Sequence, residues 1–254
     1  IGGTGEIVFG GSGTANSIRP TLGNTTLTLG SGITVHGSQG GSFVDFSGVA
    51  GIDTSYVNQG IIDADTAGKS ISLFGNWTNT GTLQASAGTL AMDGNWTTAG
   101  LGTWNSTGGT INFQGVLDNT GATLAQGNST GLLSLTTANI NGGTIAGGAQ
   151  LTGSNTFNGV TLDTDLGIAN GTTLTLLNGL TLANGHTLTL ASTGGATYLN
   201  FSGSQTIGGT GEITGTASGR PAASATIRTA SSLESMPRVA QSTTIRWPAL
   251  ASNA

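Results

Sequence analysis

The chain has 254 residues, of which 46 are glycine, 7% are charged and none is cysteine. An ordinary globular enzyme domain has about 25% charged residues and roughly 7% glycine, so the composition argues against that class. Disulfides cannot stabilise the chain, and the scarcity of Lys, Glu, Gln, Arg and Met indicates almost no α-helix. No apolar run of about 18 residues occurs, and we expect no direct membrane span in this sequence.

The first residues of the chain recur near its end. Residues 1–7 read IGGTGEI, and the same seven letters occur at residues 207–213. A second similarity relates GNTTLTLGSGITV at residues 23–35 to GTTLTLLNGLTL at residues 171–182. These similarities indicate a long repeat unit, and we expect further repeats of the same parent chain to be partners of this segment.

Residues 57–124 contain one short sequence motif four times. Each copy is a turn that ends in glycine and leads into β-branched or aliphatic residues, and the glycines lie 21, 19 and 21 positions apart. A period of about 20 residues is typical of a stacked solenoid, whose coils lie about 4.8 Å apart. Asparagine and glycine accept positive φ, so we expect them at the corners of the coils. The turn glycines, including three later ones, are Gly60, Gly81, Gly100, Gly121, Gly142, Gly159 and Gly179.

Leucine recurs at every second position in several segments, such as TTLTL at residues 25–29 and HTLTLAS at residues 186–192. This alternation is typical of a strand with one buried and one solvated face. A disordered linker rich in Gly, Ser and Thr is the alternative, but such linkers do not maintain the alternation. We therefore predict an all-β fold in which residues 1–218 form a parallel β-solenoid of about 10 to 11 coils.

Residues 219–254 differ from the rest of the chain. They carry four basic side chains and one acidic one, net +3, whereas residues 1–218 carry two basic and ten acidic ones, net −8. Three of the four prolines lie there, and the alternation stops. We predict an irregular tail that is disordered or atypical, and we expect no nucleic-acid partner because its arginines are dispersed.

The tryptophans allow two interpretations. The sequence GNWT occurs at residues 75–78 and again at residues 94–97, which would place Trp77 and Trp96 on successive coils, and Trp104 follows closely. A row of exposed rings could bind carbohydrate, because aromatic faces suit the apolar faces of sugars. We favour the alternative, a packed aromatic ladder at a corner of the coil.

Two acidic pairs are candidate metal ligands or acid/base groups. Asp63 and Asp65 lie two apart in IIDAD, as do Asp163 and Asp165 in LDTD, so each pair would share one face of a strand. Clustered carboxylates can bind Ca²⁺ or act in the cleavage of polysaccharides. The body of the chain has only two basic residues to hold an acidic polymer, and we favour solvated carboxylates.

Other motifs for catalysis or cofactor binding are weak. His36 and His186 each lie beside a turn glycine, and neither has a second histidine at metal-ligand spacing, so we expect no zinc site. No GxSxG motif occurs, and the glycine-rich segments lack the lysine and following helix of a phosphate-binding loop. We expect no catalytic residue and no cofactor, with Ca²⁺ as the one ion to consider.

Several segments of residues 1–218 resemble a known type of sequence repeat. VNQGIIDAD, GNWTNTGTL, VLDNTGATL and NGTTLTLLNGLTL look like the repeats of large bacterial surface exoproteins, namely autotransporter passenger domains and filamentous-haemagglutinin-like adhesins. The resemblance rests on repeat style and not on a unique motif. It implies a right-handed parallel β-helix.

The resemblance also implies a function. A non-enzymatic stalk or adhesin would be exported, would lie outside the cell or on its surface, and would be attached to the outer membrane through another part of its parent chain. Its partners would be receptors or glycans on host or bacterial surfaces. The alternative is a carbohydrate-binding or pectate-lyase-like, polysaccharide-degrading β-helix.

Overall fold

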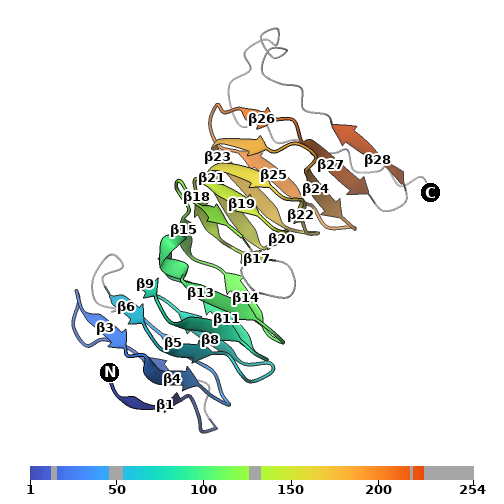
Figure 1. Cartoon of the computed structure of the whole chain (residues 1–254). Helices are drawn as coiled ribbons and strands as arrows, with labels where there is room; N and C mark the ends of the chain where they lie inside the picture. The colour runs from blue at the N-terminus through green and yellow to red at the C-terminus, as the bar shows by residue number, and fades with distance from the viewer. Residues whose placement is uncertain (13–15, 46–53, 126–132, 218–219, 226–254) are drawn as a thin grey trace.

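The computed structural model describes residues 1–12, 16–45, 54–125, 133–217 and 220–225. The chain is nearly all β, with 57% strand and 2% helix, and its parallel sheets form a β-solenoid of about nine turns. The strands stack along one axis from β1 at the N-terminal end to β27 near the other end (Figure 1). The predicted fold class is therefore confirmed.

Three sheets form the sides of the solenoid over the described residues, and neighbouring strands in each sheet are hydrogen-bonded to one another. The first sheet contains, in spatial order, β1 (Thr4–Val8), β4 (Gly32–His36), β7 (Ile61–Asp63), β10 (Thr82–Ala85) and β13 (Thr103–Ser106). The second contains β2 (Ser17–Ile18), β5 (Gly41–Phe43), β8 (Ser70–Leu73), β11 (Thr89–Met92), β14 (Thr110–Phe113), β17 (Leu133–Thr136), β20 (Ala149–Thr152), β22 (Leu166–Ile168), β24 (Thr187–Ser192), β27 (Glu212–Ala217) and β28 (Arg220–Ala225).

The third sheet contains, in spatial order, β16 (Thr123–Leu124), β19 (Thr144–Ala146), β21 (Ser154–Asp163), β18 (Asn139–Asn141), β15 (Val116–Asp118), β12 (Asn95–Thr97), β9 (Asn76–Asn79), β6 (Ser55–Asn58) and β3 (Thr26–Leu29). Strand β23 (Thr173–Leu182) also pairs with β21 and connects it to β25 (Tyr198–Phe201) and β26 (Ile207–Gly209). Because β21 and β23 each run along two shorter neighbours, two sides of the solenoid merge into one sheet in its second half. A single 3₁₀ turn, η1 (Ala99–Leu101), interrupts the described strands.

Coil length explains why the number of turns is about nine and not 10 to 11. Thr4 pairs with Gly32, 28 positions later, and the next coil is similarly long. Further along, Ile61 pairs with Thr82 and Thr82 with Thr103, each 21 positions later. The period of about 20 residues therefore describes the middle of the chain, whereas the N-terminal coils and the last coil, in which Leu180 pairs with Ile207, are longer.

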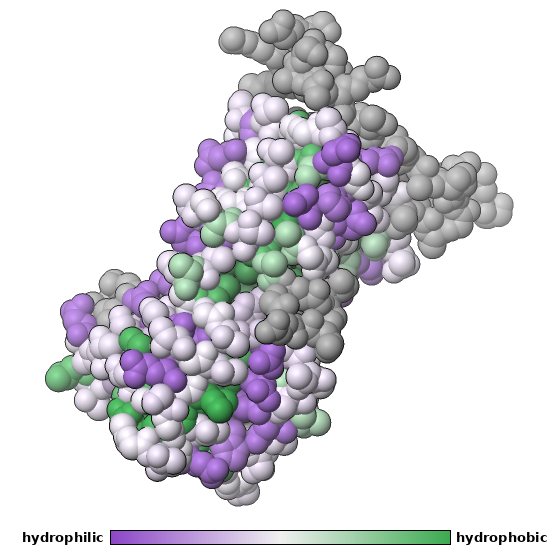
Figure 2. Space-filling model, viewed as in Figure 1, coloured by the Kyte–Doolittle hydropathy of each residue, from purple (hydrophilic) through white to green (hydrophobic). Residues whose placement is uncertain are grey.

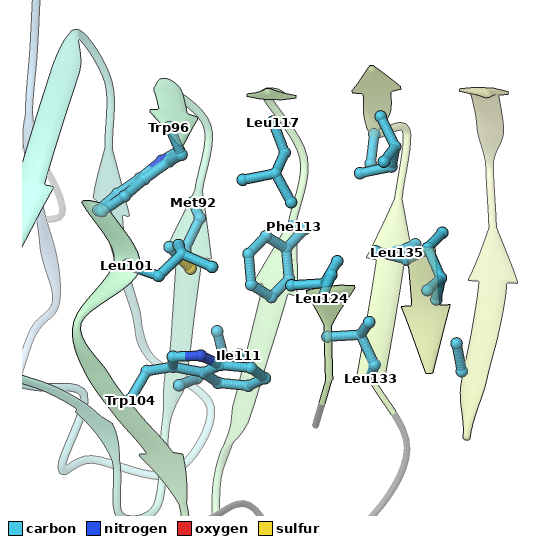
Figure 3. Close-up of a cluster of buried hydrophobic side chains, with 14 of the residues drawn as sticks. Met92, Trp96, Leu101, Trp104, Ile111, Phe113, Leu117, Leu124, Leu133 and Leu135 are labelled. Carbon is cyan, nitrogen blue, oxygen red and sulfur yellow. The ribbon is translucent and has the colours of Figure 1, made fainter. Parts of the chain in front are cut away.

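The interior is apolar because alternate residues of each strand point inward. Leu83, Leu117 and Leu162 are at most 1% exposed, and neighbouring coils place further aliphatic and aromatic side chains against them. Figure 3 shows such a layer, in which Met92 and Phe113 lie among leucines contributed by successive coils. Burial of each such side chain stabilises the fold by about 1.5–3 kcal/mol.

Two of the turn glycines, Gly60 and Gly81, serve a different purpose from the one expected. Gly60 and Gly81 do not have positive φ. A Cβ atom on Gly81 would lie 2.1 Å from the Gly60 carbonyl oxygen, and one on Gly60 would lie 2.1 Å from that of Ile33. Glycine is thus needed there because the backbones of successive coils approach closely. Positive φ does occur at later turns, including Gly142 at 67°.

The asparagines of these turns point into the solenoid. Asn58, Asn79 and Asn119 are at most 2% exposed. The Asn58 side-chain amide donates to the Asn79 side-chain oxygen at 2.7 Å, and the Asn79 amide donates to the Leu101 carbonyl at 2.7 Å. At the third turn, where the sequence has Thr98, the threonine hydroxyl donates to the Asn119 side chain at 2.6 Å. These buried amides link consecutive coils.

The predicted tail begins with regular structure. Strand β28 pairs antiparallel with β27, and among the described strand pairs it is the one exception to parallel pairing. The rest of the predicted tail, residues 226–254, lies outside the described residues, as do residues 218–219.

Candidate binding surface

The tryptophan rings lie inside the solenoid. Trp77 and Trp96 are 4% and 3% exposed, and their rings stack with centroids 5.5 Å apart and an interplanar angle of 10°. Tyr56, one coil earlier, stacks on Trp77 at 4.7 Å. The Trp77 Nε1–H donates to the Phe74 carbonyl at 2.9 Å. Successive coils thus build a continuous aromatic stack.

The row of three exposed rings that the carbohydrate-binding interpretation requires is not formed, and the rings are packed as the favoured interpretation expects. Trp104 lies on β13 of the first sheet, apart from the stack, is 8% exposed and packs edge-on against Phe113 at 5.5 Å. The physical reason is strand alternation: in the Asn-Trp-Thr strands the central residue points inward and its two neighbours point outward. No sugar could reach the faces of these rings without opening the core.

The carboxylates of Asp63 and Asp65 lie on one outer face, but they form hydrogen bonds with different neighbouring coils. Asp63 accepts hydrogen bonds from the Ser86 hydroxyl at 2.9 Å and the Gln84 amide at 3.2 Å, both on the following coil. Asp65 instead contacts the preceding coil, where His36 Nδ1 lies 2.8 Å from its Oδ2. The two groups are therefore engaged with protein partners on different coils.

His36 forms a charged cluster that links the first three coils. Its ring lies between Asp65 and Glu6, whose Oε2 is 3.7 Å from Nε2. The hydrogen bond with Asp65 raises the pKa of His36 above its usual value, and burial opposes this effect. Burial tends to raise the pKa of Asp65, but hydrogen bonds from His36, from the Gly37 N–H and from Thr66 outweigh it and lower that pKa.

The second acidic pair surrounds the other histidine. His186 Nε2 lies 3.4 Å from Asp163, and its Nδ1 lies 3.5 Å from Asp165. Both carboxylates are more than half exposed, and the backbone N–H of Thr187 donates to Asp165 at 2.8 Å. Each predicted acidic pair thus has a histidine neighbour that spacing alone did not indicate.

The arrangement of these groups bears on metal binding. Within the described ranges, no group of three or more His, Asp or Glu side chains is arranged to hold a metal ion. The two acidic pairs are about 100 positions apart and lie on different sheets, β7 in the first and β21 in the third. The structure therefore does not bring all four carboxylates together, and Ca²⁺ binding stays a prediction.

A shallow groove of about 300 Å³ lies over the third sheet. One wall is a column of Ser55, Asn76, Asn95 and Val116, which pair in register on strands β6, β9, β12 and β15. The opposite wall consists of the outward residues two positions further along each strand, Val57, Thr78, Thr97 and Asp118. The strands that carry the buried aromatic stack therefore carry this groove on their outer side.

Hydrogen bonds hold several groove side chains in place. The Asn95 amide donates to the Asn76 side-chain oxygen at 3.0 Å. The Thr97 hydroxyl accepts the Gly100 N–H at 3.0 Å, which ties it to η1. The fully exposed Asp118 carboxylate accepts the Thr120 N–H at 3.0 Å, and hydrogen bonds from the Thr120 side chain and backbone lower its pKa. This groove was not predicted from the sequence, although the repeated Asn-Trp-Thr triplets, with a polar residue on each side of tryptophan, could have indicated it.

One face of the molecule has mixed polarity. Figure 2 shows that residues of near-neutral hydropathy predominate on it, with smaller groups of hydrophilic and hydrophobic residues among them. Comparisons with protein-family models, with curated proteins and with solved structures each found no match. The described residues include no helix that is long and apolar enough to cross a membrane.

Proposed function

We propose that this chain is a non-enzymatic segment of an exported bacterial surface protein, and that its solenoid acts as a stalk or adhesin. The observation that supports this most directly is the column of outward Asn, Ser and Thr side chains repeated from coil to coil above an apolar interior. Such a rod offers the same weak contacts many times, and multivalent attachment depends on repetition of this kind.

The partners in this proposal are receptors or glycans on host or bacterial surfaces, and further repeats of the parent chain. The sequence resemblance to autotransporter passengers and filamentous-haemagglutinin-like adhesins supports the location outside the cell. The net charge of −8 over residues 1–218 is consistent with a soluble exterior that avoids nonspecific association.

Bead adhesion tests this proposal. Beads coated with the full chain are expected to attach to host epithelial cells, bacterial cells or matrix more strongly than beads coated with a Leu162→Asp variant. That substitution places a charge at a fully buried position and should unfold the solenoid. Attachment equal to that of the unfolded variant on all three surfaces would contradict the proposal.

A polysaccharide-degrading enzyme is the second candidate. The observation that favours it is the pairing of histidine with carboxylates, since His36 and Asp65 are 2.8 Å apart. Acidic and neutral polysaccharides incubated with the chain should then yield new reducing ends or unsaturated products. An Asp63→Asn/Asp65→Asn variant that retains any such activity would remove this site as its source.

A further inference from the structure

We propose that the groove over strands β6, β9, β12 and β15 binds a neutral oligosaccharide. The inference rests on the proposed adhesive function and names a ligand class and a place for it. The less favoured interpretation of the tryptophans relied on exposed ring faces to bind carbohydrate, whereas this site uses the outward side chains on the opposite side of the same strands.

The length of the groove suits one short ligand chain lying over its two wall columns. Its walls are two residues apart along each strand, which corresponds to about 6.6 Å. It crosses four neighbouring strands, so it extends about 14 Å along the solenoid axis. Its ligand would therefore lie along the axis and contact equivalent side chains on consecutive coils.

The lining favours hydroxyl groups over charged ligands. Amides of Asn76 and Asn95 and hydroxyls of Thr78 and Thr97 can both donate and accept hydrogen bonds, as sugar hydroxyls do. Among the residues that line it, none is basic and Asp118 is the one acidic residue. An acidic polymer would find no cation and would be repelled at the Asp118 end.

The groove is less suited to a peptide. Peptide strands commonly bind by hydrogen bonding to the free edge of a sheet. Strands β6, β9, β12 and β15 are interior strands of the third sheet, with a paired neighbour on both sides. Their backbone groups are therefore used within the sheet. The apolar side chains that point outward in the walls are Val57 and Val116, too few for a hydrophobic anchor.

Preorganisation supports binding at this place. The hydrogen bonds from Asn95 to Asn76 and from the Gly100 N–H to Thr97 fix three wall side chains before a ligand arrives. The aromatic stack beneath holds the strands in position. Less conformational entropy is then lost on binding, which matters for a shallow site with few contacts.

The test uses the full chain and a panel of neutral hexose and N-acetylhexosamine oligosaccharides, with oligogalacturonate as the acidic counterpart. Binding is measured by isothermal titration calorimetry. An Asn95→Leu variant should bind the best neutral ligand about tenfold more weakly, as expected for one lost hydrogen bond to a bound sugar. Thr78→Val, which keeps the side-chain shape, should also weaken binding. It provides a second test of the groove in case the first variant misfolds.

The matched control is Thr181→Val, an exposed threonine on β23 that lies several coils from the groove. It should bind as the unaltered chain does. Absence of binding to every neutral oligosaccharide, equal affinity in the groove variants, or tighter binding of oligogalacturonate would overturn the proposal. Bead adhesion by the same variants distinguishes the groove proposal from the proposed adhesive function. If chains with an altered groove still adhere, the groove is not the adhesive site, but the proposal that the rod is adhesive is not contradicted.

Discussion

The buried asparagines are the residues on which coil-to-coil register depends most directly. Asn79 receives a hydrogen bond from Asn58 and donates to the carbonyls of Leu101 and Thr103, all in the interior or at its margin. Asn79→Ala removes all three of these buried hydrogen bonds, and we expect a loss of about 3 kcal/mol in the free energy of unfolding. Urea denaturation followed by tryptophan fluorescence measures this loss.

The control for that prediction is an asparagine of the same sheet that faces solvent. Asn139→Ala on β18 should change the free energy of unfolding by less than about 0.5 kcal/mol. Equal effects of the two substitutions would show that the inward amides do not link the coils.

A second prediction at this scale concerns pH. The pKa of His36 is raised in the folded chain by Asp65, with Glu6 as a further acidic neighbour. Its contribution to stability is therefore complete below the unfolded value of about 6.5, and is lost as pH rises through the folded pKa. The lowered pKa of Asp65 has the opposite sign: its contribution is present above the unfolded value of about 3.9 and is lost as pH falls through the folded pKa.

We therefore expect the N-terminal coils to lose stability as the pH rises from about 6 to about 8, through the unfolded pKa of histidine and above it. A His36→Gln variant should lack this part of the pH dependence, because glutamine does not titrate. Urea midpoints of both chains across that range provide the measurement. Parallel pH profiles for the two chains would contradict the assignment.

At the level of the strands and turns, close stacking of successive coils leaves no room for a side chain at certain glycines. Gly81→Ala would place a methyl group 2.1 Å from the Gly60 carbonyl oxygen, and we expect a loss of about 2 kcal/mol or more. Gly167→Ala on β22 is the matched control, since no atom lies within 4 Å of its added Cβ and its φ is not positive. Thermal denaturation should separate the two variants clearly, and similar melting temperatures would refute close backbone approach at Gly81.

The sequence predicted the elements well because strand alternation is a local property. The leucines of residues 25–29 and 186–192 alternate with polar residues, and the strands there are β3 and β24. The spacing of the turns located the coils. The expectation that Gly60 and Gly81 are glycine because of positive φ was wrong. Positive φ can be inferred from one turn, whereas a contact between stacked backbones depends on the neighbouring coil.

The candidate site was harder to predict for a related reason. His36 and Asp65 are 29 positions apart, and their contact depends on N-terminal coils longer than the 20-residue period. The groove depends on which residues of the Asn-Trp-Thr strands face outward. Alternation predicts that Trp77 and its neighbours point in opposite directions, but it does not say which of them faces the core.

As a whole molecule, the chain is a rod of about nine turns. At about 4.8 Å per turn it extends roughly 43 Å, somewhat less than 10 to 11 coils would give. A repeated exterior on a continuous core suits attachment through many weak contacts, and the same regularity allows a direct test of the fold.

That test is the distance between residues of adjacent coils. Thr82 and Thr103 pair in register on β10 and β13, so their Cα atoms should lie about 4.8 Å apart. The chain has no native cysteine, so Thr82→Cys and Thr103→Cys can be spin-labelled specifically. We predict strong dipolar broadening of the electron paramagnetic resonance spectrum for this pair, and none for a control pair at residues 82 and 181, several coils apart. A spectrum of the first pair equal to the sum of its single-label spectra would contradict the stacked solenoid.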